Sequence, residues 1–362
     1  MKYPALAGAV LAALAVVSLA LAGVPDAAAI QPAVAGSILV PPAEAAPEPA
    51  PKRPHAVWAA IRFTIKEYEL IPFARLRELG VGTIFPHFGR LRVLANGRVE
   101  LYDFYGNVIW PDHRAELKKM VARLHQEGFR VIPWLSVKRA KPEGSFWIYD
   151  NWAPLVKTVK SFVTDLKIDG FQLDPEPLNV CDVTALNTGL GWLKRVLRER
   201  ELGVATPKLV PGTPDIESGY QWGGVEPFAK LTNADALYLM TYDTRAPDPA
   251  AYARLLDDNL AVARKLCGST RVYLGLPAYP ADPPPKPKQP RPGQPPEPPR
   301  PPAHAMPPEE GHTFARALLR HKDLGMLAGV AVYDLEEPGD AHWLAAWTLA
   351  EDGLAALNKR MR

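Results

Sequence analysis

Three polar side chains follow one another at the end of a short apolar segment near the middle of the chain. The segment Ile168–Glu176 (IDGFQLDPE) predicts a buried strand. Because side chains alternate along a strand, Gln172, Asp174 and Glu176 should project from one face. Such groups are costly to bury unless they are paired or used. A glutamic acid with a helper carboxylate beside it would suit general acid catalysis, whereas a solvated loop acid is the other interpretation.

The chain around this strand alternates between short apolar runs and helical stretches from residue 56 onward. The predicted strands are Val57–Phe63, Gly82–Phe88, Arg130–Val137, Ile168–Asp174, Lys208–Thr213, Ala236–Tyr242, Arg271–Pro277 and Gly329–Asp334. The predicted helices are Pro72–Leu79, His113–Gln126, Ala153–Leu166, Val183–Arg200, Glu226–Leu231, Pro249–Leu266, Thr313–Lys322 and Ala341–Asn358. Eight strand–helix units over about 300 residues predict an α/β fold of the (β/α)8 barrel type. A doubly wound open sheet is the rival, although no Gly-rich phosphate turn follows the first predicted strand.

Two insertions interrupt this alternation of strands and helices, and each follows the carboxyl end of a strand. Leu91–Tyr102, after the second strand, alternates around Asn96-Gly97, which predicts a β-hairpin. Residues 281–311, after the seventh strand, are rich in proline and predict an extended polyproline segment. In barrels of this type the carboxyl ends of the strands form the functional face.

Carboxylates and aromatic rings recur where the predicted strands end. These positions are Arg62, Phe63, His87, Trp134, Ser136, Asp174, Glu176, Thr213, Asp215, Tyr242, Asp243, Tyr279, Tyr333, Asp334 and Glu336. Aromatic faces stack on the apolar faces of pyranose rings, while carboxylates bond sugar hydroxyls and deliver protons. The ring of strand ends therefore predicts a sugar site. Trp58 is interpreted as a packing aromatic, and His87 as a strand-end polar group.

Four segments resemble motifs of glycoside hydrolase family 18, the chitinase family. Asp169–Glu176 is similar to that family's strand-four signature Asp-Gly-x-Asp-x-Asp-x-Glu, and Met240–Asp243 to its strand-six Met-x-Tyr-Asp. Leu274–Tyr279 resembles its strand-seven Gly-Leu-Pro-x-Tyr, and Gly329–Tyr333 the start of its strand eight. The four motifs occur in the family's order across residues 56–358.

The resemblance implies substrate-assisted retaining hydrolysis, an exception to the two-carboxylate mechanism. Glu176 would protonate the glycosidic oxygen, and the 2-acetamido carbonyl of the substrate would attack the anomeric carbon. Asp174 would orient the acetamido N–H and stabilise the oxazolinium intermediate, while Tyr242 would bond the acetamido oxygen.

Further residues would bind the substrate if the resemblance holds. They are Gln172, Asp243, Trp134, Tyr279 and Tyr333. Tyr333 stands where the family usually has Trp, and Gln172 where it usually has a second Asp. A glutamine can hydrogen-bond Asp174 but cannot take its proton, which predicts a slow enzyme. No closely spaced His or Cys cluster suggests a metal, and no cofactor is expected.

Two other functions stay open. The family includes lectin-like members without catalysis, so the chain could be a weakly active or inactive glycan-binding barrel. Alternatively, Asp174 could be the nucleophile and Asp243 the acid of a retaining glycosidase of another family. That mechanism would require their carboxyl groups to lie about 5 Å apart.

The N-terminal residues have the composition of an export signal. Residues 1–29 have a basic start, an apolar stretch and small residues at a cleavage position, which predicts a signal peptide or an uncleaved membrane anchor. Residues 30–55 predict an Ala/Pro-rich linker to a catalytic domain over residues 56–362. Cys181 and Cys267 should be free, because the barrel would hold them at opposite ends.

Export narrows the expected substrates and partners. We expect a periplasmic, secreted or membrane-anchored protein that acts on peptidoglycan, a chitin-like polymer or an exopolysaccharide containing GlcNAc. The formal net charge of +3, without a dense basic run, argues against nucleic acid as a partner. Nothing predicts a subunit partner, and we expect a monomer.

Overall fold

The structure is a computed structural model that describes residues 54–59, 67–94, 98–103, 106–138, 152–212, 220–244, 246–278, 311–322, 324–335 and 341–361. The predicted signal or anchor (residues 1–29) and most of the predicted linker lie outside these ranges. So do Asn96-Gly97 and nearly all of the proline-rich segment. Among the described helices, none is both long and apolar enough to cross a membrane.

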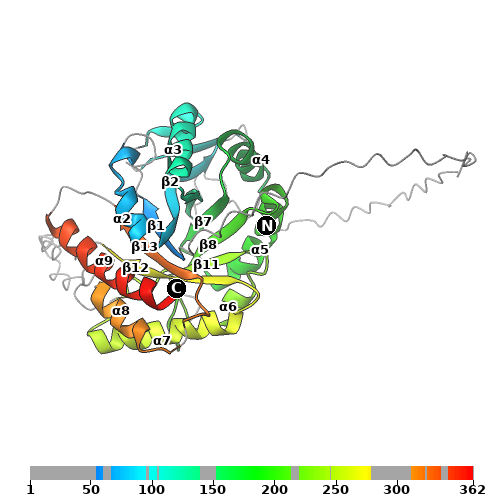
Figure 1. The fold of residues 1–362 in the computed structure, drawn as a ribbon. Coiled ribbons are helices and arrows are strands. Elements are labelled where there is room, and N and C mark those ends of the chain that lie inside the picture. The colour runs from blue at the N-terminus through cyan, green and yellow to red at the C-terminus, as the bar shows by residue number, and fades with distance from the viewer. Residues whose placement is uncertain are drawn as a thin grey trace, which may run out of the picture. The chain divides into compact units, whose positions relative to one another are not determined.

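Eight parallel strands close into a barrel, which confirms the predicted fold class (Figure 1). In chain order they are β1 (His55–Ala59), β2 (Val81–Val93), β6 (Trp134–Lys138), β7 (Gly170–Glu176), β8 (Glu201–Thr206), β11 (Ala236–Leu239), β12 (Arg271–Pro277) and β13 (Gly329–Leu335). The order around the barrel is β1-β13-β12-β11-β8-β7-β6-β2, and pairing of β1 with β2 closes the ring. The short strand β5 (Arg130–Val131) pairs with β2 just before β6, so the third predicted strand has two parts.

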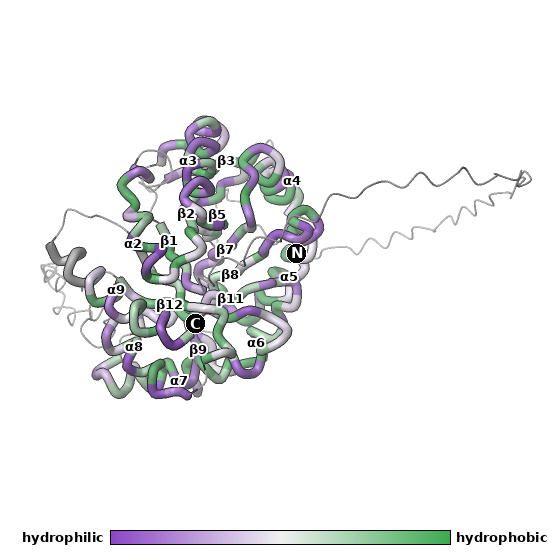
Figure 2. The backbone as a smooth tube through the Cα atoms, viewed as in Figure 1, coloured by the Kyte–Doolittle hydropathy of each residue, from purple (hydrophilic) through white to green (hydrophobic). Residues whose placement is uncertain are grey.

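Helices surround the barrel at the positions that hydrophobic periodicity predicts. They are α2 (Phe73–Glu78), α3 (Arg114–Gln126), α4 (Ala153–Ser161) with a π-helical turn Phe162–Leu166, α5 (Val183–Leu197), α6 (Glu226–Ala229), α7 (Pro249–Leu266), α8 (Gly311–Leu319) and α9 (Ala341–Met361). Hydrophobic and hydrophilic residues alternate along α3 and α7 (Figure 2), because only one face of each helix packs on the strands. Helix α7 starts where it was predicted, since the Asp248 carboxylate caps it by accepting a hydrogen bond from the Ala251 amide at 2.7 Å.

The strands separate two apolar cores. The outer core lies between strands and helices and is largely aliphatic, with Leu117, Leu190 and Leu256 among its buried residues. The inner core fills the barrel and is rich in aromatic rings: Trp58, Phe85, Trp134, Tyr238, Tyr242 and Tyr273, with Tyr333 packed against it. The strand alternation that separates these two sets also directs polar side chains into the barrel mouth.

The fifth strand lies earlier in the chain than predicted. Barrel strand β8 is Glu201–Thr206, whereas Lys208–Leu209 forms β9, which pairs with β10 (Gln221–Trp222) in a separate two-stranded sheet. The sequence of β8 is inconspicuous because small residues face inward beside Tyr238. A Cβ atom added at Gly203 would lie 2.5 Å from the Tyr238 ring. The predicted fifth-strand end residues Thr213 and Asp215 lie outside the described residues.

The insertion after β2 is a hairpin, as predicted, but it is larger. Residues 90–93 pair antiparallel with β3 (Val99–Tyr102), and β4 (Val108–Trp110) adds a third strand that was not predicted. Cys181 and Cys267 are free and exposed, which confirms that expectation.

Candidate active site

Strand β7 carries the predicted catalytic residues from the barrel interior out to its mouth. Gln172 is fully buried, Asp174 is 7 % exposed and Glu176 is only partly buried. Their spacing by two residues places them on the inward face, as the sequence predicted. Glu176 therefore lies nearest to solvent, with Asp174 one step deeper.

Gln172 is held by a tryptophan from the first strand. The Trp58 indole Nε1–H donates to Gln172 Oε1 at 3.1 Å, so Trp58 has a polar contact beyond the packing role that was predicted for it. The amide nitrogen of Gln172 is buried and has no hydrogen-bond partner among the described residues. The bond to Trp58 fixes the amide so that its N–H donors lie on the other side of the group.

Asp174 is contacted by the strand beside it. Ser136 of β6 lies in register with Asp174, and its hydroxyl donates to Asp174 Oδ2 at 3.3 Å. His87 Nε2 lies 3.3 Å from the same Ser136 oxygen. The His87 ring stacks on Trp134, with 4.0 Å between centroids, and both rings are buried. Trp134 therefore supports His87 from inside the barrel.

Tyr242 follows the sixth barrel strand and faces Asp174 and Glu176. Its ring stacks on Tyr333 with 4.5 Å between centroids and 6° between planes, and Trp58 meets both rings edge-on. Burial raises the pKa of Tyr242 well above its usual value, and the nearby Tyr333, Asp174, Glu176 and Asp243 raise it further. The hydroxyl therefore stays protonated and can donate a hydrogen bond.

The backbone beside Tyr242 is anchored from two sides. The Lys208 ammonium donates to the Tyr242 carbonyl at 2.8 Å, and the Tyr252 hydroxyl donates to the Thr241 carbonyl at 3.0 Å. Asp243 follows with a left-handed backbone (φ 52°) and is partly buried. Of the predicted substrate-binding residues, Tyr279 lies outside the described residues. Trp134 and Tyr333 belong to or pack against the inner core, Gln172 contacts Trp58 there, and Asp243 lies near Tyr242.

Tyr220 is a site residue that the sequence did not reveal. It is 48 % exposed, and its pKa is raised by partial burial and by the charges of Glu176 and Asp174. The neighbouring Trp222 is fully buried and donates from Nε1 to the Leu178 carbonyl at 3.0 Å, two residues beyond Glu176. Tyr220 therefore offers a partly exposed ring near the two carboxylates. No pattern in the sequence indicated it, because it lies outside every predicted strand.

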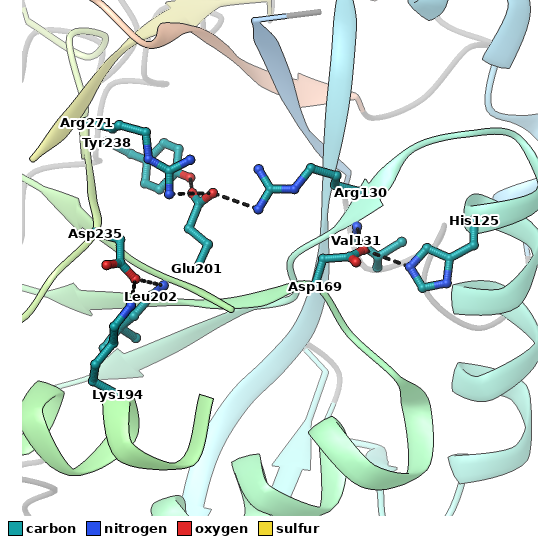
Figure 3. A network of polar contacts seen from close by, with 10 residues as sticks. All are labelled: His125, Arg130, Val131, Asp169, Lys194, Glu201, Leu202, Asp235, Tyr238 and Arg271. Atoms are coloured by element: carbon teal, nitrogen blue, oxygen red, sulfur yellow. Dashed lines mark hydrogen bonds and ion pairs between the residues drawn. The ribbon is translucent and has the colours of Figure 1, made fainter. Parts of the chain in front are cut away.

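The opposite end of the barrel holds a second set of carboxylates (Figure 3). Glu201 lies inside the barrel, 2.9 Å from Arg130 and 3.1 Å from Arg271, and accepts a hydrogen bond from Tyr238. Asp169, the first residue of the chitinase-like motif, accepts from the Val131 amide at 2.7 Å and lies 2.7 Å from His125 Nε2. Asp169 is therefore a structural residue of the base and lies apart from the site.

A metal centre is not evident in the part of the chain that the structure describes. No group of three or more His, Cys, Asp or Glu side chains is arranged there to hold an ion.

Comparison with known proteins finds similarity in three dimensions only. No family model matches the chain, and no curated protein resembles it in sequence. A solved C-terminal domain of a putative chitinase from Desulfitobacterium hafniense is 15% identical, with a TM-score of 0.54 over 85% of this chain and 99% of that one. A chitinase from Chromobacterium violaceum is 18% identical, with a TM-score of 0.51 over 82% and 98%. The spore cortex-lytic enzyme SleL of Bacillus cereus is 14% identical, with a TM-score of 0.52 over 83% and 73%. The resemblance inferred from the motifs is thus confirmed at the level of fold: this chain has the barrel of bacterial chitinases and of SleL.

Proposed function

We propose that the chain is a glycoside hydrolase that cleaves GlcNAc-containing glycans, with Glu176 as the proton donor. The observation that carries the proposal is that Asp174 and Glu176 of β7 lie near Tyr242 at one barrel mouth. The charges of both carboxylates contribute to the raised pKa of the Tyr242 hydroxyl. The fold shared with chitinases and SleL is consistent with this reaction, although a fold alone does not define one.

The first step would use all three residues. Glu176 gives its proton to the glycosidic oxygen as the bond from that oxygen to the anomeric carbon breaks. The acetamido carbonyl oxygen of the same sugar forms a new bond to that carbon, which gives an oxazolinium ion. Asp174 accepts a hydrogen bond from the acetamido N–H and offsets the positive charge, while the Tyr242 hydroxyl donates to the acetamido oxygen.

The second step would return the enzyme to its starting state. The Glu176 carboxylate takes a proton from a water molecule, and the resulting hydroxide oxygen attacks the anomeric carbon. The bond to the acetamido oxygen breaks, and the product keeps its original anomeric configuration. Gln172 cannot share a proton with Asp174, because its amide holds none that it can release near neutral pH.

The substrate class follows from the mechanism and from the predicted export signal. A sugar with a 2-acetamido group is required, and peptidoglycan strands, chitin-like polymers and GlcNAc exopolysaccharides all contain one. We propose that the chain acts outside the cytoplasm, either released or held at the membrane by residues 1–29. Both the location and the glycan are part of the proposal.

The test compares the wild type with Glu176→Gln on chito-oligosaccharides, peptidoglycan and poly-GlcNAc. The variant should lose turnover by about 10²–10⁴-fold, since only the acid is removed, and should keep its affinity for chito-oligosaccharide in calorimetry. Glu116→Gln, an exposed carboxylate on α3, is the matched control and should cleave like the wild type. Nuclear magnetic resonance of the fresh product should show retained configuration, and an analogue without the acetamido group should not be cleaved.

Three outcomes would contradict the proposed function or its mechanism. Equal turnover by Glu176→Gln and the wild type would remove Glu176 from its role. Loss of turnover in Asp243→Asn together with cleavage of the analogue would favour the retaining mechanism that uses Asp174 and Asp243. Binding without turnover by the wild type on every substrate would indicate a glycan-binding barrel.

A further inference from the structure

A buried histidine lies one hydrogen bond behind the serine that contacts Asp174. His87 from β2, Ser136 from β6 and Asp174 from β7 form a chain across three adjacent barrel strands. His87 is 1 % exposed, Ser136 8 % and Asp174 7 %. Both links measure 3.3 Å, which is long for hydrogen bonds, and such contacts in active sites tighten when substrate binds.

The direction of this chain follows from the number of hydrogens available. A serine hydroxyl has one hydrogen, and here it is donated to the Asp174 carboxylate. The Ser136 oxygen can therefore only accept from His87, so His87 Nε2 must be the nitrogen that bears the hydrogen. The tautomer places one N–H behind the hydroxyl, and this N–H strengthens the bond from the hydroxyl to the carboxylate.

The imidazole contributes a donor and no charge. Burial and, to a smaller extent, the nearby charge of Arg90 together lower the pKa of His87 to about 3. Trp134 covers one face of the ring and keeps it in place. At the pH of any ordinary hydrolase His87 is neutral, and its effect on Asp174 must pass through the hydrogen bonds.

Acidic and neutral side chains lie close to Asp174 on β7 and after the sixth strand, and the cation Arg90 of β2 is in register with Ser136 and lies near His87. Glu176 on the same strand is a second acid, and Asp243 and Tyr242 lie beyond the sixth strand. Tyr220 also lies within reach of the Asp174 charge. Gln172 is neutral and its oxygen already accepts from Trp58. A hydrogen bond donated to the carboxylate is the kind of contact that keeps such an acid ionised.

We propose that His87 is a positioning residue, which acts through Ser136 to hold Asp174 ionised and in one orientation. In this chain the pair takes the place of the second acid that Gln172 cannot supply. The catalytic consequence rests on the proposed function, because an ionised and oriented Asp174 matters for turnover only if it stabilises the oxazolinium ion. The effect on ionisation itself does not depend on turnover.

The experiment follows the ionisation of Asp174 by carbon-13 nuclear magnetic resonance in full-length protein labelled at the aspartate carboxyl carbons. Asp174→Asn identifies the resonance. Ser136→Ala should raise the titration midpoint of Asp174 by about one pH unit, because a hydrogen bond to the charged form is lost. His87→Leu should raise it by about half as much, since the hydroxyl stays without its support.

Two further variants separate positioning from simple packing. His87→Gln places an amide N–H near the position of Nε2 and should restore the wild-type midpoint. The double variant His87→Leu/Ser136→Ala should match Ser136→Ala alone, because His87 acts through the hydroxyl. His312→Leu, an exposed histidine on α8, is the control and should leave the midpoint unchanged.

The results distinguish this inference from the proposed function. Unchanged midpoints in both Ser136→Ala and His87→Leu would overturn the inference, as would a double variant that exceeds Ser136→Ala. If His87→Leu fails to fold, His87→Phe, which can keep the stack on Trp134 but has no N–H, takes its place with the same expected midpoint. If the wild type cleaves no glycan while the midpoints move as expected, the proposed function fails and the inference stands. In an active enzyme the acid limb of kcat/KM should move upward by the same amount as the midpoint.

Discussion

At the base of the barrel Glu201 is contacted by two arginines and Tyr238, whereas at the mouth Asp174 accepts from neutral Ser136 and lies near Glu176. Asp169 and Asp235 repeat the pattern at the base, where each carboxylate meets a basic side chain and a backbone N–H (Figure 3). The amide nitrogen of Gln172, which lies below Asp174, has no hydrogen-bond partner among the described residues.

The difference indicates that the carboxylates at the base stabilise the barrel, whereas those at the mouth serve its function. Paired carboxylates at the base connect the amino ends of neighbouring strands and leave little for a ligand to contact. At the mouth, acids are held close to one another by the fold and by neutral hydrogen bonds. Such an arrangement lowers stability and is typical of functional sites.

The largest effect on stability should come from the base. Glu201→Ala removes the buried partner of Arg130 and Arg271, whose side chains are 44 % and 45 % exposed, and leaves a cavity in which the Tyr238 hydroxyl has lost its acceptor. The free energy of unfolding, measured by chemical denaturation, should fall by about 2–4 kcal/mol, because a cavity and an unpaired buried hydroxyl remain while water screens the two arginines. Glutamine at the same position should cost less, since it keeps the volume and a hydrogen bond to Tyr238. A loss below 1 kcal/mol would show that the ion pairs of Glu201 contribute little to the stability of this end of the barrel.

Acid should destabilise both ends through one buried histidine each. His55 begins β1 at the base, and its Nδ1 accepts from the Val330 amide; burial lowers its pKa to about 4, while that of His87 is lowered to about 3. Below the unfolded-state pKa of about 6.5, these histidines are protonated in the unfolded chain but stay neutral in the folded one. The free energy of unfolding therefore falls as the pH falls. Each histidine should cost about 2 kcal/mol at pH 5 relative to pH 7.

The measurement is the free energy of unfolding from pH 7 to pH 4 for the wild type, His55→Gln and His87→Gln. Each variant should lose about half of the pH dependence that the two histidines cause together. His312→Leu, whose ring is exposed, should follow the wild-type curve. A pH profile that neither buried variant alters would mean that both rings become protonated without penalty.

The smallest effect should appear at Gln172, where the mouth meets the inner core. Gln172→Asp restores an acid able to share a proton with Asp174, and kcat should rise by about tenfold, equivalent to about 1.4 kcal/mol. Stability should fall slightly, because the shorter side chain weakens the bond to Trp58 and adds a buried acid. Gln172→Asn shortens the side chain without adding an acid and is the matched control. A clear loss of stability with no gain in rate would indicate a strand refitted for binding.

The sequence was sufficient to predict most of the helices and barrel strands and the inward face of β7. Periodicity predicted the barrel and the bounds of α7, and alternation by two placed Gln172, Asp174 and Glu176 on one side. These inferences succeeded because they depend on local geometry, which is repeated regularly along helices and strands.

Strand β8 and the environment of Asp174 depended on tertiary structure. The inward side of β8 could be Gly203 and Ala205 only because Tyr238, from another strand, fills the space above them. The contacts of Trp58 with Gln172 and of His87 with Ser136 join residues that are 114 and 49 positions apart. Which side chains meet at such distances depends on strand order and on the register with which the barrel closes, and a single sequence does not encode either in any local pattern. The sequence therefore determined which residues could do chemistry, and the closure of the barrel determined which of them stand together.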